Sequence, residues 1–159
     1  QVAEAVLTSH ALHLEAFISV QPPYNMLERE VERELIPCCQ AYGIGILPYY
    51  PLASGFLTGK YGRGESLSEG TRLYDFAKAR SNLTDWNFDL LDRLTVFASE
   101  RGHSTLELAI AWLLANPSVG SVIAGAKLPE QVVANVKAAD WQLTPEDLHE
   151  IGGILNGGE

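Results

Sequence analysis

Short apolar runs alternate with helical patterns along this chain, and this alternation restricts the possible folds more than any other feature. The runs lie at 17–20, 43–47 and 121–124, and the segments between them contain apolar residues at helical spacing. Strands that are separated by helices run parallel in a sheet, because a tight turn can join only antiparallel strands. Right-handed crossovers place all the helices on one side if such a sheet curls into a barrel. The order of elements therefore predicts an α/β fold with three parallel strands and surrounding helices.

Local signals indicate where some of the predicted helices begin and end. Thr144 suits an N-cap, Pro145 suits the first helical position, and Asp147 follows three residues after Thr144. Pro37 indicates a short turn or a kink inside an earlier helix. The helices are expected at 2–14, 30–42, 88–101, 105–116, 129–139 and from residue 145 onward.

Three strands are too few to close a (β/α)8 TIM barrel, which needs about 250 residues, whereas this chain has 159. We therefore predict the C-terminal half of such a barrel, occupying residues 1–159. A segment at about 51–86, rich in Gly, Ser and Arg, is too long for an ordinary connection and favours a functional lid. Open strand edges and an apolar inner face would invite association. The expected partner is a second copy in a homo-oligomer or a missing N-terminal half.

Composition argues against several classes of partner. Hydrophobic residues make up 47% of the chain, enough for one domain with a core, while the net charge of −9 and the lack of a basic run argue against nucleic acid. No stretch has the length of a membrane span, and the start lacks the order of a signal peptide. The adjacent Cys38 and Cys39 do not suit a mutual disulfide, and no Cys/His spacing resembles a metal site. These features favour a reducing cytoplasm, and Gln1, which stands directly in a helical pattern, suggests a piece of a longer protein.

The loop after the last predicted strand has a pattern that suits an anionic ligand. Pro129 fits the first helical position, which makes Leu128 the N-cap. Leucine has no side-chain acceptor, so the first N–H groups of the helix would stay open at its positive end, beside Lys127. A phosphate would satisfy these groups; alternatively, water caps the helix and Lys127 is a solvated charge. The loop at 48–55 follows another parallel strand and would lie at the same edge of the sheet.

Residues at these strand ends and along the helices resemble the aldo-keto reductases, over nearly the whole chain and in the same order. In the first half the matching residues are Gln21, Tyr24-Asn25, Arg29, Tyr49, Pro51-Leu52-Ala53 and Gly55-Phe56-Leu57-Thr58-Gly59-Lys60-Tyr61. In the second half they lie at 108–114, 122–126, 130–131, 135 and 141–144. The resemblance is closest to the bacterial and potassium-channel-β-subunit-like branches. It implies a barrel oxidoreductase that binds NADP(H) and reduces aldehydes or ketones by hydride transfer.

The resemblance also implies where a nicotinamide dinucleotide would lie along the first of the two loops. Gln21 would hydrogen-bond the nicotinamide carboxamide, and Tyr49 would stack on the nicotinamide ring. Tyr50, Leu52 and Ser54 would follow the pyrophosphate, with Leu52 contributing its backbone N–H. Many members of the family have Ser where this chain has Tyr50, which departs from the usual phosphate contact.

The adenosine end of the nucleotide would lie on the second loop and the helix that follows it. The resemblance assigns Gly125 to the cofactor-binding loop and brings Lys127 and Gln131 to the adenosine 2′-phosphate. Asn135 would contact the adenine. Ala134 stands where many members have Glu or Gln, so one adenine contact of the family is not reproduced.

No catalytic residue is assigned in this chain. The catalytic Asp, Tyr, Lys and His of the family belong to the first half of the barrel, so a carbonyl substrate is expected only if that missing half is supplied, and the isolated chain is expected to be inactive. His10, His13, His103 and His149 are interpreted as solvated or packing residues, and Tyr24 as a loop residue that closes a barrel end.

Two other nucleotide-binding motifs are excluded. Only three residues separate Gly55 from Gly59, where a phosphate loop needs four, and Tyr61 replaces the Ser or Thr that would bind Mg²⁺. No Gly-x-Gly-x-x-Gly follows a strand, so the site is not of the Rossmann type. Two functions remain open: the cofactor-binding half of an NADP(H)-dependent reductase, or a self-standing half-barrel that oligomerises and at most binds nucleotide.

Overall fold

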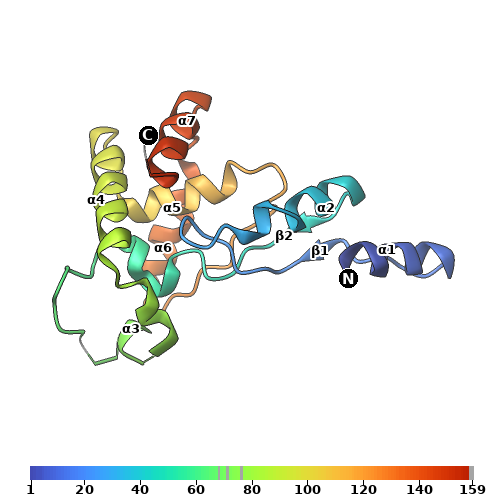
Figure 1. Ribbon diagram of the computed structural model, residues 1–159, viewed down its shortest axis with the longest axis horizontal. Coiled ribbons are helices and arrows are strands. Elements are labelled where there is room, and N and C mark those ends of the chain that lie inside the picture. Colours follow the sequence, from blue (N-terminus) through green and yellow to red (C-terminus); the bar gives the residue numbers. More distant parts are fainter. Residues whose placement is uncertain (68, 71, 76, 158–159) are drawn as a thin grey trace.

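Two short parallel strands form the sheet in the computed structural model, which describes residues 1–67, 69–70, 72–75 and 77–157. β1 (Ser19–Val20) pairs with β2 (Gly45–Ile46), with Ser19 opposite Gly45 and Val20 opposite Ile46. The connection between them contains the 3₁₀ turn η1 (Glu30–Glu32) and helix α2 (Leu35–Tyr42). This strand–helix–strand order confirms the predicted parallel arrangement of an α/β partial barrel (Figure 1).

The third predicted strand, at 121–124, is not a continuous strand. The segment lies parallel to β2 on the side opposite β1, but it forms only single bridges, from Val119 to Ile46 and from Ile123 to Tyr49. Pro48 lies between those two bridges and has no N–H to donate. Its carbonyl accepts the Ile123 N–H (2.8 Å), whereas the Ile46 carbonyl accepts the Gly120 N–H (3.0 Å). Two residues on one side therefore face three on the other, and this extra residue breaks the ladder.

The helices follow the predicted order, with shifted ends. α1 (Val2–Ala11) ends before residue 14, and α2 begins only at Leu35, so that Pro37 lies in its first turn, where a missing N–H breaks no helical bond. The remaining helices and turns are η2 (Ala53–Thr58), α3 (Arg72–Asp75), η3 (Ala77–Asn82), α4 (Asp85–Glu100), α5 (Thr105–Leu114), α6 (Pro129–Lys137), η4 (Ala138–Asp140) and α7 (Pro145–Leu155). None of the helices within these described segments is long and apolar enough to cross a membrane.

Two hydrophobic clusters hold these elements together. The larger one gathers side chains of η2, α4, α5 and α7 and includes Phe56 and Phe88, whose ring centroids lie 5.2 Å apart. The smaller one joins α1, α2 and the strands through residues such as Ile36 and Ile46. Trp112 on α5 packs against both clusters. In Figure 1, α1 and α2 lie at one end of the molecule, and α4 to α7 lie at the other.

The segment at 51–86 is not one open loop over the pocket. Its first part forms η2, in which Phe56 and Leu57 are fully buried in the larger cluster. Its later part contains α3 and η3, and Leu73 of α3 is also buried. Residues 68, 71 and 76 of the predicted lid lie outside the described residues. The beginning of the segment is therefore part of the core.

Capping boxes at two helix starts make the stability of the fold depend on pH. Thr144 and Asp147 form the predicted box on α7, and Ser104 and Glu107 form another on α5. The Thr144 N–H, reinforced by Arg101 at 2.8 Å, holds the pKa of Asp147 below its usual value, and the Ser104 N–H does the same for the pKa of Glu107.

The free energy of unfolding is expected to fall as the solution is acidified below about pH 4. A carboxylate whose pKa is lower in the folded state stabilises the fold above its unfolded pKa, and this contribution is lost as the pH falls through the folded pKa. Urea denaturation at a series of pH values measures this loss. Asp147→Asn should flatten the acid limb, and an unchanged limb in that variant would contradict the assignment to this carboxylate.

Candidate functional site

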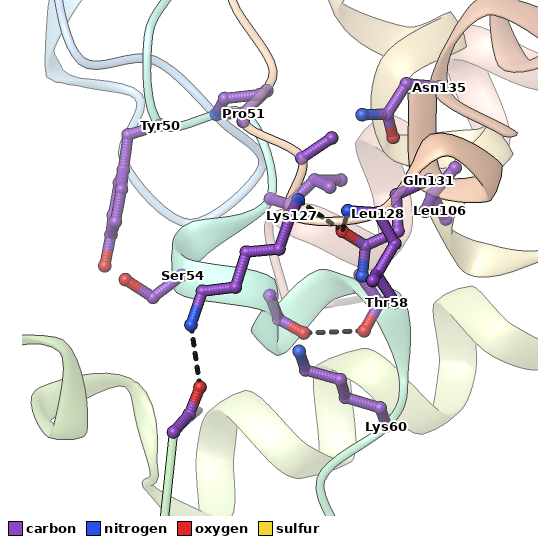
Figure 2. Close-up of a pocket in the computed structure, with 15 residues that line it drawn as sticks. Tyr50, Pro51, Ser54, Thr58, Lys60, Leu106, Lys127, Leu128, Gln131 and Asn135 are labelled. Atoms are coloured by element: carbon purple, nitrogen blue, oxygen red, sulfur yellow. Dashed lines mark hydrogen bonds between the residues drawn. The ribbon is translucent and has the colours of Figure 1, made fainter. Parts of the chain in front are cut away.

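A pocket of about 380 Å³ lies where the loop after β2 meets the loop before α6 (Figure 2). One wall comes from the first loop and η2, and the opposite wall comes from the second loop and the start of α6. The residues that line it are Tyr50, Pro51, Leu52, Ser54, Gly55, Thr58, Lys60, Gly70, Leu106, Gly125, Ala126, Lys127, Leu128, Gln131 and Asn135. The two loops that the sequence singled out thus share one cavity at the carboxyl ends of the parallel segments.

Seven of the nine predicted cofactor-binding residues line this pocket: Tyr50, Leu52, Ser54, Gly125, Lys127, Gln131 and Asn135. Gln21 and Tyr49 do not. Gln21 is exposed directly after β1, and Tyr49 is 45% exposed, with its backbone bridged to Pro23 and Ile123. Both lie at strand ends outside the pocket lining, so the pocket is lined by residues predicted for the phosphates and adenosine but not by the two predicted for the nicotinamide.

The start of α6 is less open than the sequence suggests. Leu128 is the N-cap and Pro129 takes the first position, as expected. The side-chain oxygen of Gln131, however, turns back and accepts the N–H groups of Lys127 (2.7 Å) and Leu128 (3.3 Å). The Gln131 N–H also donates to the Leu128 carbonyl at 3.1 Å, so the expectation that the first N–H groups of the helix stay open is wrong for Gln131. An incoming phosphate would have to share or displace the Gln131 amide.

Two ammonium groups line the pocket. Lys127 reaches across it, and its Nζ donates to the Gly70 carbonyl at 2.8 Å (Figure 2). Lys60 comes from the end of η2, where its Nζ lies 5.0 Å from the Tyr61 ring centroid. Sequence reasoning did not assign Lys60 to the site, because it tested the stretch from Gly55 only as a phosphate loop. The signal that could have found it is the pair Gly55 and Gly59, whose positive φ angles of 87° and 74° turn the chain back toward the pocket.

The backbone of the first loop adopts an unusual shape. Tyr50, Ala53 and Ser54 have φ angles of 66°, 47° and 57°, a left-handed region that non-glycine residues seldom occupy. The Tyr50 carbonyl accepts the Ala53 N–H at 3.2 Å and so closes a turn. The Tyr50 hydroxyl accepts a hydrogen bond from Asn82 Nδ2 at 3.4 Å. Such a conformation persists only where surrounding contacts hold it.

A polar cluster supports the neighbouring loop after β1. The Tyr24 hydroxyl donates to Glu32 Oε1 at 2.8 Å, and Arg29 pairs with Glu32 and also donates to Asn156 Oδ1 at 3.2 Å. Burial, followed by the bond to Glu32, raises the pKa of Tyr24 above its ordinary value. The Tyr24 ring packs on Trp112, with centroids 5.2 Å apart. Tyr24 is thus held in a packed, hydrogen-bonded position and is not among the residues that line the pocket.

Histidines and cysteines do not contribute to the pocket. His103 stacks on Trp141 with ring centroids 3.9 Å apart, and Cys38 and Cys39 are free thiols on α2. Within the described part of the chain, no group of three or more His, Cys, Asp or Glu side chains is placed to hold a metal ion.

Parallel strands joined by helices, with a ligand-sized pocket at their carboxyl ends, define a segment of an α/β barrel. The model of the aldo/keto reductase family matches residues 3–156, and the chain belongs to that family. The glycerol dehydrogenase AKR11B4 from Gluconobacter oxydans has a similar structure, with a TM-score of 0.73 and 29% identity, over 86% of this chain and 42% of that one.

Curated relatives include both channel subunits and reductases. A probable voltage-gated potassium channel subunit beta of Oryza sativa subsp. japonica is 39% identical, over 98% of this chain and 49% of the relative. A putative voltage-gated potassium channel subunit beta of Schizosaccharomyces pombe is 41% identical, over 91% and 44%. The L-glyceraldehyde 3-phosphate reductase of Escherichia coli K12 is 36% identical, over 86% and 42%. This chain therefore spans about half the length of the relatives it matches.

Proposed function

We propose that the pocket binds NADP(H) and that this chain is the cofactor-holding half of an aldo-keto reductase that reduces aldehydes or ketones by hydride transfer. The observation that carries this proposal is the meeting of the two loops in one cavity, with the ammonium groups of Lys60 and Lys127 on its lining. The chain has a net charge of −9, so a pocket lined by two ammonium groups differs from the acidic character of the chain as a whole. They favour an anionic ligand of limited size.

Lys127 is proposed to contact the adenosine 2′-phosphate. Its ammonium has three donors, of which the structure commits one to the Gly70 carbonyl. The others remain able to bond a phosphate without breaking that contact. Gln131 and Asn135 follow on the same side of α6, where they would contact the phosphate and the adenine. Gln21 and Tyr49 are proposed to bind the nicotinamide at the adjoining strand ends.

The alternative function is a self-standing half-barrel that associates and at most binds nucleotide. The exposed residues Phe17 and Ile18, just before β1, favour association of the isolated chain in either case. The two functions can be distinguished by joining this chain to the segment that its longer relatives carry. The first function predicts that the joined protein reduces carbonyls, and the second predicts that it does not.

Lys127→Ala is expected to weaken NADPH binding by about 10- to 100-fold, because it removes a charge-assisted hydrogen bond of about 1.5–3 kcal/mol. NADH lacks the 2′-phosphate, so its affinity should barely move. Both nucleotides are titrated by quenching of intrinsic fluorescence, with the chain alone or joined to the segment that its longer relatives carry, whichever form binds nucleotide.

Lys137→Ala is the matched control, since Lys137 is exposed at the other end of α6 and does not line the pocket. It should leave both affinities unchanged. Equal losses for NADPH and NADH in Lys127→Ala would indicate general damage, and no loss for NADPH would make Lys127 a solvated surface charge. If neither form binds either nucleotide, the proposed function is wrong.

A further inference from the structure

Asn25 is fully buried, and its side chain uses both of its polar atoms. Its Oδ1 accepts the N–H groups of Leu27 (2.9 Å) and Glu28 (3.0 Å), which closes a local turn after β1. Its Nδ2 points the other way and donates to the Tyr50 carbonyl at 3.0 Å. One amide therefore joins the loop after β1 to the loop after β2.

The carbonyl that accepts this bond belongs to Tyr50, the first of the three non-glycine residues with positive φ in the loop after β2 and in η2. The Tyr50 carbonyl also accepts the Ala53 N–H, so Asn25 and Ala53 together satisfy it. The preceding residues are tied in the same way, because the Tyr24 N–H donates to the Tyr49 carbonyl at 3.2 Å. These bonds fix the direction of the chain just before Pro51, Leu52 and Ser54 line the pocket.

We propose that Asn25 is a positioning residue for nucleotide binding: its amide holds Tyr50 in the left-handed conformation and so presets the wall of the pocket, without itself lining the pocket. This inference rests on the proposed function. An amide is suited to this task because it offers a donor to Tyr50 and an acceptor to the local turn at the same time. A preset loop binds more tightly because less ordering occurs on binding.

The contribution of the donor can be tested separately from that of the acceptor. Asn25→Asp keeps the size of the side chain and the acceptor for Leu27 and Glu28, but it replaces the donor with a second oxygen that faces the Tyr50 carbonyl. Losing one such bond is expected to weaken the binding of NADPH and NADH alike, by about 10-fold each. The loop faces the part that both nucleotides share, so the loss should not depend on the 2′-phosphate.

A second substitution distinguishes positioning from a general loss of stability. Glycine adopts positive φ without steric strain, so in a Tyr50→Gly background the loop depends less on Asn25 to hold that conformation. The effect of Asn25→Asp on affinity should therefore shrink in that background. Asn25→Ser, which is uncharged and too short to reach Tyr50, replaces Asn25→Asp if the buried carboxylate prevents folding, as judged by circular dichroism.

The matched control is Gln40→Glu, since the exposed Gln40 amide donates to Ser118 Oγ at 3.0 Å, so that this substitution also removes an amide donor, at a residue that does not line the pocket. It should leave nucleotide affinity unchanged. Unchanged affinity in the Asn25 variants, a loss confined to NADPH, or an equal loss with and without Tyr50→Gly would each overturn the inference while leaving the proposed function standing. Failure of the unmodified protein to bind either nucleotide would overturn both.

Discussion

The purified 159-residue chain is expected to show no NADPH-dependent reduction of small aldehydes above background. Hydride transfer to a carbonyl needs a proton donor at the carbonyl oxygen, tuned by neighbouring groups. Within the described residues, the hydroxyl of the buried Tyr24 donates a hydrogen bond to Glu32. No described residue matches the catalytic set, which the family resemblance assigns to the other half of the barrel. The loss of NADPH absorbance after addition of aldehyde measures the rate directly.

The control for this experiment is the same chain joined to the segment that its longer relatives carry. That form should gain NADPH oxidation that depends on the aldehyde. Turnover by the 159-residue chain alone that disappears when one of its own residues is substituted would contradict the half-barrel interpretation. If the joined form binds NADPH but reduces no carbonyl, the alternative function of a nucleotide-binding half-barrel is favoured.

The isolated chain is also expected to self-associate. Phe17 and Ile18, just before β1, are 69% and 83% exposed, and among the described strands only β2 pairs with β1. Val133 and Val136 on α6 are each 68% exposed. Apolar groups and an unpaired strand edge favour contact with another chain. Sedimentation at several protein concentrations should show a dimer or larger species.

Ile18→Lys provides the comparison for this experiment, because a charge beside an open strand edge opposes pairing. It should shift the sedimentation profile toward the monomer, whereas a lysine at the exposed position Glu100 should not. A compact monomer that binds no hydrophobic dye would contradict the expectation. The first part of the segment after Pro51 is not free to cover the exposed groups, since Phe56 and Leu57 are buried in the larger cluster.

The elements with strong local signals were the ones that sequence could predict. The cap at Thr144 and the Pro129 helix start are local chemistry, and both are confirmed. The strands were predicted too long, because a ladder depends on its partner as well as its own residues. In the part of the chain that the structure describes, β1 has a strand partner on one side only, and Pro48 interrupts the pairing beyond β2.

The pocket was predictable to the extent that parallel strands bring their carboxyl ends together. The sequence did not predict that the Gln131 amide turns back onto the backbone of Lys127 and Leu128. An amide at the third helical position can bond either the backbone or a ligand. Lys60 was missed for a different reason. The stretch from Gly55 was compared only with a phosphate loop, whereas its glycines, Gly55 and Gly59, have the positive φ angles that turn the chain before Lys60. The roles assigned to the individual cofactor-binding residues stay predictions.

The Arg29–Asn156 contact has a consequence for the order of folding. It joins residues 127 apart in the sequence, whereas the Arg29–Glu32 pair is local. The entropic cost of closing a chain segment grows with its length, and contacts between distant residues slow folding. The local pair can form while the chain is still open, but the bond to Asn156 needs the loop after β1 and the end of α7 to be brought together. Arg29 therefore takes part both in a contact with a small entropic cost of closure and in one with a large cost.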